Sequence, residues 1–239
     1  MKKTRTLLIV LIVMIFILLS ITGCNQGKKR FEAQFLQLFD TITTIVAYMD
    51  SEDEFNEIWY DYFDMGYDYG RVQEEIFKTD DEFLKDAASF GRGIRILSQE
   101  PFEVLISFII SQNKNIPAIK SSIESISKMF GEKKKIGSVT YYTFPTAEAL
   151  SKASIEELRE ARLGYRDKYI QNAANLVASK ELDLDQLKSM DHKEAFKELN
   201  NIYGVGPKVA NCISLFGLHH LDMIPVDVWI ARILKEIYN

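Results

Sequence analysis

The segment that most constrains this 239-residue chain runs from 199 to 232 and reads LNNIYGVGPKVANCISLFGLHHLDMIPVDVWIAR. Apolar residues at helical spacing lead into Gly-Val-Gly at 204–206, where glycine adopts a positive φ without steric cost. Pro207 suits the first position of a new helix because its missing N–H is no loss there, and Gly217 is placed to end that helix. The segment therefore predicts a helix, a tight turn, a second helix, a loop and a third helix.

This arrangement carries chemistry at the start of the second helix. The backbone N–H groups of residues 204–208 are expected to point out of a helix N-terminus, where they can hold a phosphate. Lys208 lies in the first turn, and the helix dipole together with burial is expected to disfavour its cation. A neutral lysine amine can form a Schiff base at a carbon centre. Asp227 is placed as a helix N-cap and could face Lys208 if the loop folds back.

Each of these features also has a plainer interpretation. Taken alone, Gly-x-Gly-Pro-Lys is a turn followed by a surface lysine, and an aspartate before a helix is an ordinary cap. The run GVGPKVANC followed by IPVDVW, however, resembles the helix-hairpin-helix DNA glycosylases, and within them the 8-oxoguanine DNA glycosylase/lyase family. The resemblance implies that Lys208 is the Schiff-base nucleophile and that Asp227 stabilises positive charge on the sugar. It also implies that Gly204, Val205 and Gly206 bind the DNA backbone.

The resemblance extends to four further residues. The run PFEVLISFIISQNKNI is similar to the family's gap-filling loop, so Asn113 would contact the cytosine left without a partner. Tyr165 would be wedged into the duplex and Arg166 would reach the cytosine, although a packed aromatic beside a surface charge is the simpler alternative. Cys212 would lie against the extruded base, or would simply be a small buried residue.

The family also implies a partner, a reaction and an ion. The partner is double-stranded DNA that contains 8-oxoguanine or an abasic site, bound by a monomer. The reaction is base excision with strand cleavage, and no cofactor is needed. An alkali ion could be held by the backbone carbonyls of Asn200, Ile202 and Val205. The family has further helices after the position of Asp227, so we expect weakened lesion recognition here. The alternatives are a poorly selective abasic-site lyase and a non-catalytic DNA-binding fragment.

The first residues suggest a different origin. Residues 1–24 combine a basic start, an apolar run and a lipobox-like Ile-Thr-Gly-Cys ending at Cys24, which predicts a secretory or lipoprotein signal. The stretch FEAQFLQLFDTITTIVAYMDSEDEF resembles the amino terminus of bacterial FAD:protein FMN transferases, which are lipoproteins. We therefore expect 25–57 to be an unrelated appended segment and 58–239 to be the glycosylase domain. A membrane lipoprotein fragment is the corresponding alternative, and it conflicts with cytoplasmic DNA repair.

The remaining pattern predicts a mainly α fold. Apolar residues recur at helical spacing at 101–111 and 116–130, whereas β-branched residues suggest strands only at 41–48 and weakly at 138–143. Three lysines at 133–135 suggest a solvated turn. The net charge of −5 is unfavourable for a nucleic-acid partner, but acidic residues concentrate between 50 and 82 and basic residues between 114 and 168, so a local basic face can still serve such a partner. Two cysteines provide neither a disulfide framework nor a zinc pattern.

Overall fold

The computed structural model describes residues 28–38, 41–136 and 138–238, so the predicted signal at 1–24 lies outside the described residues. The described residues divide into two compact units, one formed by those between 28 and 60 with 73–94 and the other by 61–72 with those between 95 and 238. Within the described ranges, no helix combines the length and the hydropathy that crossing a membrane requires.

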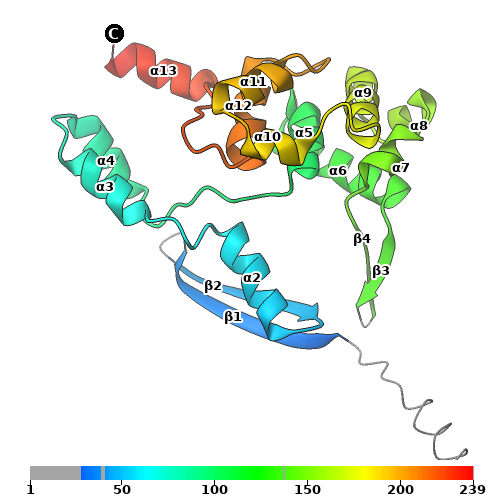
Figure 1. Cartoon of the computed structure of the whole chain (residues 1–239), viewed down its shortest axis with the longest axis horizontal. Coiled ribbons are helices and arrows are strands. Elements are labelled where there is room, and N and C mark those ends of the chain that lie inside the picture. Colours follow the sequence, from blue (N-terminus) through cyan, green and yellow to red (C-terminus); the bar gives the residue numbers. More distant parts are fainter. Residues whose placement is uncertain (1–27, 39–40, 137, 239) are drawn as a thin grey trace, which may run out of the picture. The chain divides into compact units, whose positions relative to one another are not determined.

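The first unit contains a two-stranded antiparallel sheet. Strand β1 (Lys29–Leu38) pairs with β2 (Thr41–Met49), with Lys29 opposite Met49 and Phe35 opposite Thr43. Helix α2 (Glu52–Tyr62) follows, and its Phe55 packs on Phe31 of β1 with ring centroids 5.9 Å apart. Phe55 is 2% exposed, so it anchors the helix on the hairpin. Helices α3 (Tyr69–Phe77) and α4 (Glu82–Phe90) come next along the chain (Figure 1).

The second unit is a helical bundle around an apolar central helix. Helix α5 (Pro101–Ser111) begins with proline at its first turn, and its Leu105, Ile106, Ile109 and Ile110 are fully buried. Such a helix, apolar on most of its sides, is stable only when other helices cover it. The helices of the bundle after α5 are α6 (Ile116–Phe130), α7 (Ala147–Ser151), α8 (Ile155–Glu160), the short 3₁₀ helix η1 (Gly164–Arg166), α9 (Asp167–Ala178), α10 (Leu184–Ser189), α11 (His192–Asn200), α12 (Pro207–Phe216) and α13 (Val228–Ile237).

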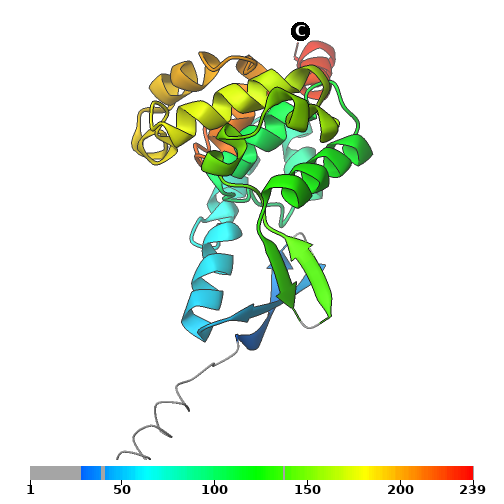
Figure 2. The same cartoon turned by 90° about the vertical axis from the view of Figure 1, so that its right-hand side faces the viewer.

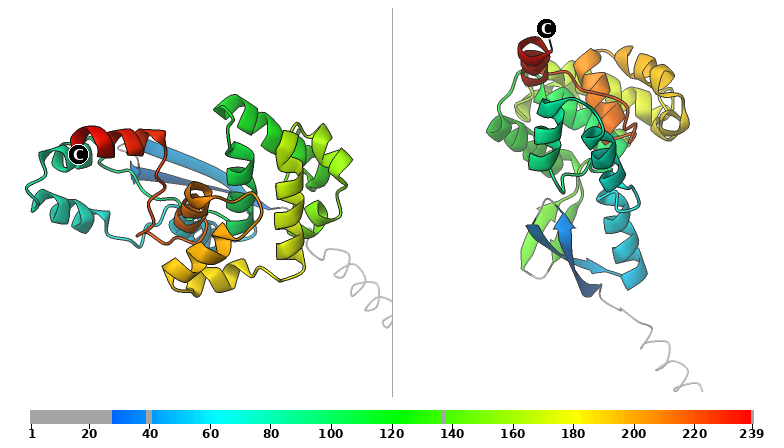
Figure 3. Two further views of the ribbon diagram at one scale, coloured as in Figure 1. Left: turned by 90° about the horizontal axis from the view of Figure 1, so that it is seen from above. Right: turned by 90° about the vertical axis from the view of Figure 1, so that its left-hand side faces the viewer.

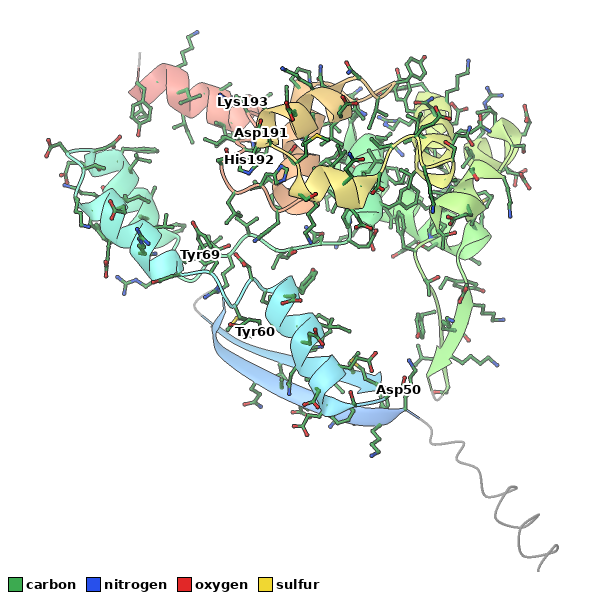
Figure 4. All side chains as sticks on the ribbon, in the orientation of Figure 1. Asp50, Tyr60, Tyr69, Asp191, His192 and Lys193 are labelled. Atoms are coloured by element: carbon green, nitrogen blue, oxygen red, sulfur yellow. The ribbon has the colours of Figure 1, made fainter. Side chains whose placement is uncertain are left out.

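Most helices begin where the sequence provides a cap. Asn115 caps α6, Thr146 caps α7, and Ser154 forms a capping box with Glu157 at the start of α8. Asp191 caps α11, which begins at His192; Figure 4 labels both residues at that end of the helix. The mainly α fold is confirmed.

A second hairpin corrects one prediction. Residues 133–135 do not form a turn but belong to β3 (Lys133–Ile136), which pairs with β4 (Val139–Tyr142). The hairpin extends away from the helices around it (Figure 2). Successive side chains of a strand point to opposite faces, and both faces of a two-stranded ribbon can be exposed to water. A lysine-rich strand is therefore tolerated there. Gly131 enters this hairpin where a Cβ atom would lie 1.9 Å from the carbonyl oxygen of Thr143, so only glycine fits.

Helix α13 differs from the rest of the bundle. None of its residues is buried, and it extends away from α10, α11 and α12 (Figure 3). Helix α13 is nevertheless relevant to the site, because its N-cap is Asp227.

Candidate active site

The hairpin between α11 and α12 has the predicted form. Leu199, Ile202 and Val205 are buried and fix the turn on the bundle, and the Val205 N–H donates to the Ile202 carbonyl at 2.9 Å. Gly204 has a φ of +88°, as the turn requires. The Val205 N–H is therefore used inside the turn and is not available to a phosphate, which corrects the expectation that every amide of 204–208 is free.

The two glycines of the turn are not equivalent. A Cβ atom at Gly204 would lie 2.2 Å from Cγ of Tyr169, so the tyrosine ring occupies the space of the missing side chain. Gly206 has an ordinary φ of −93° and open space where its Cβ would be. Sequence reasoning assigned both glycines to the turn, whereas the conformational demand falls on Gly204 alone.

The start of α12 faces solvent. Gly206 is its N-cap without a side-chain hydrogen bond, and Pro207 has no N–H. Among the described residues, no backbone or side-chain acceptor is recorded for the N–H groups of Gly206, Lys208 and Val209. Such amides at a helix N-terminus can hold an anion.

Lys208 is exposed, which corrects the expectation that burial helps to neutralise it. Its Nζ lies 5.8 Å from the ring centroid of Phe108 on α5, and Phe108 stacks on Phe216 at 5.8 Å. The amine thus leaves the helix N-terminus toward an aromatic surface. Lys208 is therefore distinguished by its position in the first turn of α12 and not by burial.

Asp227 and Cys212 are the other two residues predicted to act beside that amine. Oδ1 of Asp227 accepts the N–H groups of Trp229 at 2.9 Å and Ile230 at 3.0 Å, so the carboxylate caps α13 as predicted. Burial raises the pKa of the Cys212 thiol, while the charge of Lys208 lowers it and that of Asp227 raises it. The charges of Lys208 and Asp227 therefore both reach the Cys212 thiol. A direct approach of Asp227 to the Lys208 amine stays a prediction.

The predicted gap-filling loop is hydrogen-bonded to the hairpin turn through Gln112, a residue that the sequence analysis did not single out. Asn113 is exposed with a φ of +49°, a conformation that asparagine tolerates better than most residues. Next to it, Gln112 donates through Nε2 to the Gly204 carbonyl at 2.9 Å. The amide of Gln112 was visible in the sequence, but nothing in its spacing indicates a partner so distant along the chain.

Tyr165 is the first of three tyrosines in edge-to-face contact. Tyr165 and Tyr169 have ring centroids 5.9 Å apart, and Tyr169 and Tyr203 have centroids 4.8 Å apart. Tyr165 is 54% exposed, which is compatible with a wedge. An open groove of about 710 Å³ runs beside them; it is lined by Arg159, Arg162, Gly164, Tyr165, Asp167, Lys168, Tyr169 and Tyr203.

Arg166 differs from its predicted setting because its side chain is 4% exposed. The guanidinium donates to the Gln112 carbonyl through Nε at 2.9 Å, to the Leu163 carbonyl at 3.1 Å and to the Asn113 carbonyl at 3.4 Å. Nη2, which donates to the Asn113 carbonyl, also donates to the Gln112 carbonyl. In this structure Arg166 therefore holds the Asn113 loop, and contact with a base stays a prediction.

No cluster of three or more His, Cys, Asp or Glu side chains within the described ranges is arranged to hold a metal ion. The carbonyls of Asn200, Ile202 and Val205 surround the hairpin turn, and only that of Ile202 accepts a recorded turn hydrogen bond among the described residues. Each carbonyl has two lone pairs, so these oxygens retain capacity for a hard cation.

Comparison with known proteins agrees with this geometry. Residues 106–239 match the HhH-GPD superfamily of base excision DNA repair proteins, and residues 28–105 match the N-terminal domain of 8-oxoguanine DNA glycosylase. The structure of MBOgg1 in complex with a low-affinity DNA ligand is 38% identical, with a TM-score of 0.76 over 90% of this chain and 76% of that one. The chain belongs to the 8-oxoguanine glycosylase family of the HhH-GPD superfamily.

Other relatives of this glycosylase family agree. The apo-form of the 8-oxoguanine glycosylase/lyase of Clostridium acetobutylicum is 35% identical, with a TM-score of 0.76 over 90% of this chain and 78% of that one. The N-glycosylase/DNA lyase of Saccharomyces cerevisiae is 43% identical over 62% of this chain and 43% of its own length. A probable N-glycosylase/DNA lyase of Methanothermobacter thermautotrophicus is 32% identical over 74% of this chain and 62% of its own length. The chain thus spans about half the length of the curated relatives it matches.

The match also corrects the predicted start of the family likeness. We expected it to begin at residue 58, with 25–57 unrelated, but the N-terminal domain match begins at residue 28. The β1–β2 hairpin and α2 lie within the matched stretch. The family's amino-terminal domain is therefore represented here, at least from β1 onward.

Proposed function

We propose that this glycosylase removes 8-oxoguanine opposite cytosine from double-stranded DNA and cleaves the strand at the resulting abasic site. The observation that carries the proposal is the exposed N-terminus of α12 with Lys208 in its first turn, and the charges of Lys208 and Asp227 both reach the Cys212 thiol. In the proposal, the amine is the nucleophile, the Asp227 carboxylate stabilises positive charge, and the free helix amides bind phosphate. The relatives named N-glycosylase/DNA lyase support the same reaction class.

The chemistry balances with Lys208 as the only covalent participant. Its neutral Nζ attacks the sugar C1′, the bond from C1′ to the base breaks, and the base leaves with the electron pair and takes up a proton. Opening of the sugar ring then gives a C1′=N iminium. Loss of a C2′ proton expels the 3′-phosphate, and water hydrolyses the imine to release the amine.

Asp227 has a fixed position from which to assist. Its Oδ1 is occupied by two N–H groups of α13, so the carboxylate cannot rotate freely and its other oxygen remains for the sugar. A carboxylate held near developing positive charge lowers the barrier without reorganising during the reaction. We propose that Asp227 acts in this way and does not attack carbon itself.

Binding is assigned to the surrounding loops. In the proposal, the amides of Gly206 and Lys208 hold a phosphate and Tyr165 enters the stack beside the lesion. Asn113 offers donor and acceptor groups to the unpaired cytosine, and Cys212 lies beside the extruded base. An alkali ion at the hairpin carbonyls would add positive charge next to the bound phosphate.

The site of action follows from the substrate. We propose that the protein works on chromosomal DNA in the cytoplasm, as expected for a base-excision repair glycosylase. The signal predicted at residues 1–24 conflicts with that assignment, and cell fractionation with an antibody to the glycosylase region would test it.

The proposal is tested by borohydride trapping on an 8-oxoguanine:cytosine duplex and on an abasic duplex. We expect a covalent complex with the wild-type protein and none with Lys208→Gln. Lys193→Gln, on the exposed side of α11, is the matched control and should trap as the wild type does. Equal trapping by Lys208→Gln would refute the lysine assignment, and duplex binding without trapping by the wild type would favour a non-catalytic DNA-binding protein.

A further inference from the structure

Two segments carry the residues assigned to the unpaired cytosine and to the base stack, and we refer to both as loops although the second includes η1. One holds Asn113 and the other, residues 162–166, holds Tyr165. Each loop contains a non-glycine residue in the left-handed region, with φ of +49° at Asn113 and +60° at Arg162. Such conformations cost free energy and persist only when their surroundings hold them. The question is therefore what holds these two.

Two cationic side chains join the loops, and each loop supplies one of them to the backbone of the other. Arg166 from the second loop donates to the Gln112 and Asn113 carbonyls of the first. In return, Nζ of Lys114 donates to the Arg162 carbonyl at 2.9 Å and to Oγ of Ser122 at 2.6 Å. Each strained residue therefore has its own carbonyl bound by a cation from the other loop.

Ser122 completes this contact from inside the bundle. Its side chain is 1% exposed, and its hydroxyl lies 3.4 Å from the same Arg162 carbonyl. Lys114 is thus directed inward, toward α6 and the second loop, and burial lowers the pKa of its amine, with the charge of Arg166 acting in the same direction. A lysine that served only to attract phosphate would gain nothing from this placement.

We propose that Lys114 is a positioning residue that, with Ser122, fixes Asn113 and Tyr165 relative to each other and so sets the preference for cytosine opposite the lesion. The inference rests on the proposed function for its catalytic readout. It assigns Lys114 a role in discrimination between opposite bases, separate from the phosphate contacts that supply general affinity.

The experiment compares the wild type with Lys114→Met and Ser122→Ala. Excision of 8-oxoguanine is measured opposite cytosine and opposite adenine, and each rate is normalised to trapping on a single-stranded abasic oligonucleotide, which has no opposite base. We expect the cytosine-to-adenine ratio to fall about tenfold in Lys114→Met, the size of one well-placed base contact, and less in Ser122→Ala. Lys128→Met, which removes the same charge from the exposed end of α6, should keep the wild-type ratio.

Salt dependence separates positioning from phosphate binding. Loss of a phosphate-contacting lysine lowers the slope of log affinity against log salt by about one. We expect no such change for Lys114→Met. An unchanged ratio in a folded Lys114→Met protein, or a reduced slope with an unchanged ratio, would overturn the proposal.

A readout without DNA keeps the inference independent of the enzyme assignment. Hydrogen exchange in peptides covering 111–116 and 162–166 should be faster in Lys114→Met than in the wild type, since both loops lose a bond. If the wild type traps no abasic DNA, the proposed function fails while this arm still decides the inference, and unchanged exchange in both loops overturns it. If Lys114→Met does not fold, Ser122→Ala carries the same measurements.

Discussion

Oδ2 of Asp64 lies 3.2 Å from Nε2 of His219, and both residues have left-handed backbones, with φ of +50° and +59°. Asp64 also accepts the hydroxyl of Tyr69 at 2.8 Å. His219 belongs to the loop that runs from α12 to the cap of α13, and its ring nitrogens have no aligned hydrogen bond in the described structure. The pair is therefore a close polar contact that ties residues before the bundle to the loop carrying Asp227.

Removal of this contact should loosen the loop. Asp64→Ala leaves the Tyr69 hydroxyl without its acceptor and removes the carboxylate beside the His219 ring, so we expect a loss of about 1–3 kcal/mol in the free energy of unfolding, measured by urea denaturation. Asp61→Ala, on an exposed residue nearby, is the control and should stay within about 0.5 kcal/mol of the wild type. Equal stability of the two variants would show that the contact contributes nothing.

The two hairpin glycines should respond differently to alanine. In Gly204→Ala the new methyl group would collide with the Tyr169 ring and the residue would keep a positive φ, so we expect a lowered melting temperature and lost DNA binding. Gly206→Ala has room for its methyl group and should fold normally. Its DNA affinity should nevertheless fall, because the methyl group stands where a phosphate would approach. Calorimetry and duplex titration of both variants provide the check.

The effect of the Lys208 and Asp227 charges on Cys212 can be tested through the reactivity of its thiol. Because the Lys208 charge lowers the pKa of Cys212 and the Asp227 charge raises it, Asp227→Asn should speed alkylation of Cys212 and Lys208→Gln should slow it. Mass spectrometry of the peptide that contains Cys212 distinguishes it from Cys24. The same rate in all three proteins would mean that the charges are too distant to act together.

Alkaline pH should reveal the titration of the partly buried Tyr69 phenol. Burial raises the pKa of Tyr69 to about 12, and the carboxylate of Asp64 acts in the same direction. A group whose pKa is higher in the folded state stabilises the fold fully below its unfolded pKa and loses that contribution as pH rises through the folded value. The Tyr69 contribution should therefore disappear between about pH 10 and about pH 12.

Tyr69→Phe removes this titration. The stability difference between the wild type and Tyr69→Phe should be largest near pH 9 and should shrink toward pH 12, measured by denaturant unfolding at each pH. A difference that stays constant across this range would mean that the phenol ionises as readily in the folded protein as in the unfolded chain.

Local signals in the sequence were sufficient for much of the fold. Pro101 and the apolar run after it predict α5, and Ser154 with Glu157 predicts the start of α8, because caps and periodicity act over a few residues. The segment around Lys208 likewise carries its own turn and helix start. These features need no knowledge of distant parts of the chain.

The errors arise where a distant partner decides the structure. Strand β1 contains no Val, Ile or Thr and is a strand because β2 pairs with it. Arg166 is buried because the Gln112 and Asn113 carbonyls accept its guanidinium, and Gln112 is joined to Gly204 across most of the bundle's sequence. Neither contact has a signature in spacing or composition.

The ring of Tyr169 occupies the space above Gly204 and touches the rings of Tyr165 and Tyr203. Tyr165 is therefore connected to the hairpin backbone through the ring of Tyr169. If Tyr165 inserts into a base stack and the turn binds phosphate, as proposed, the two events should be mechanically coupled through this ring.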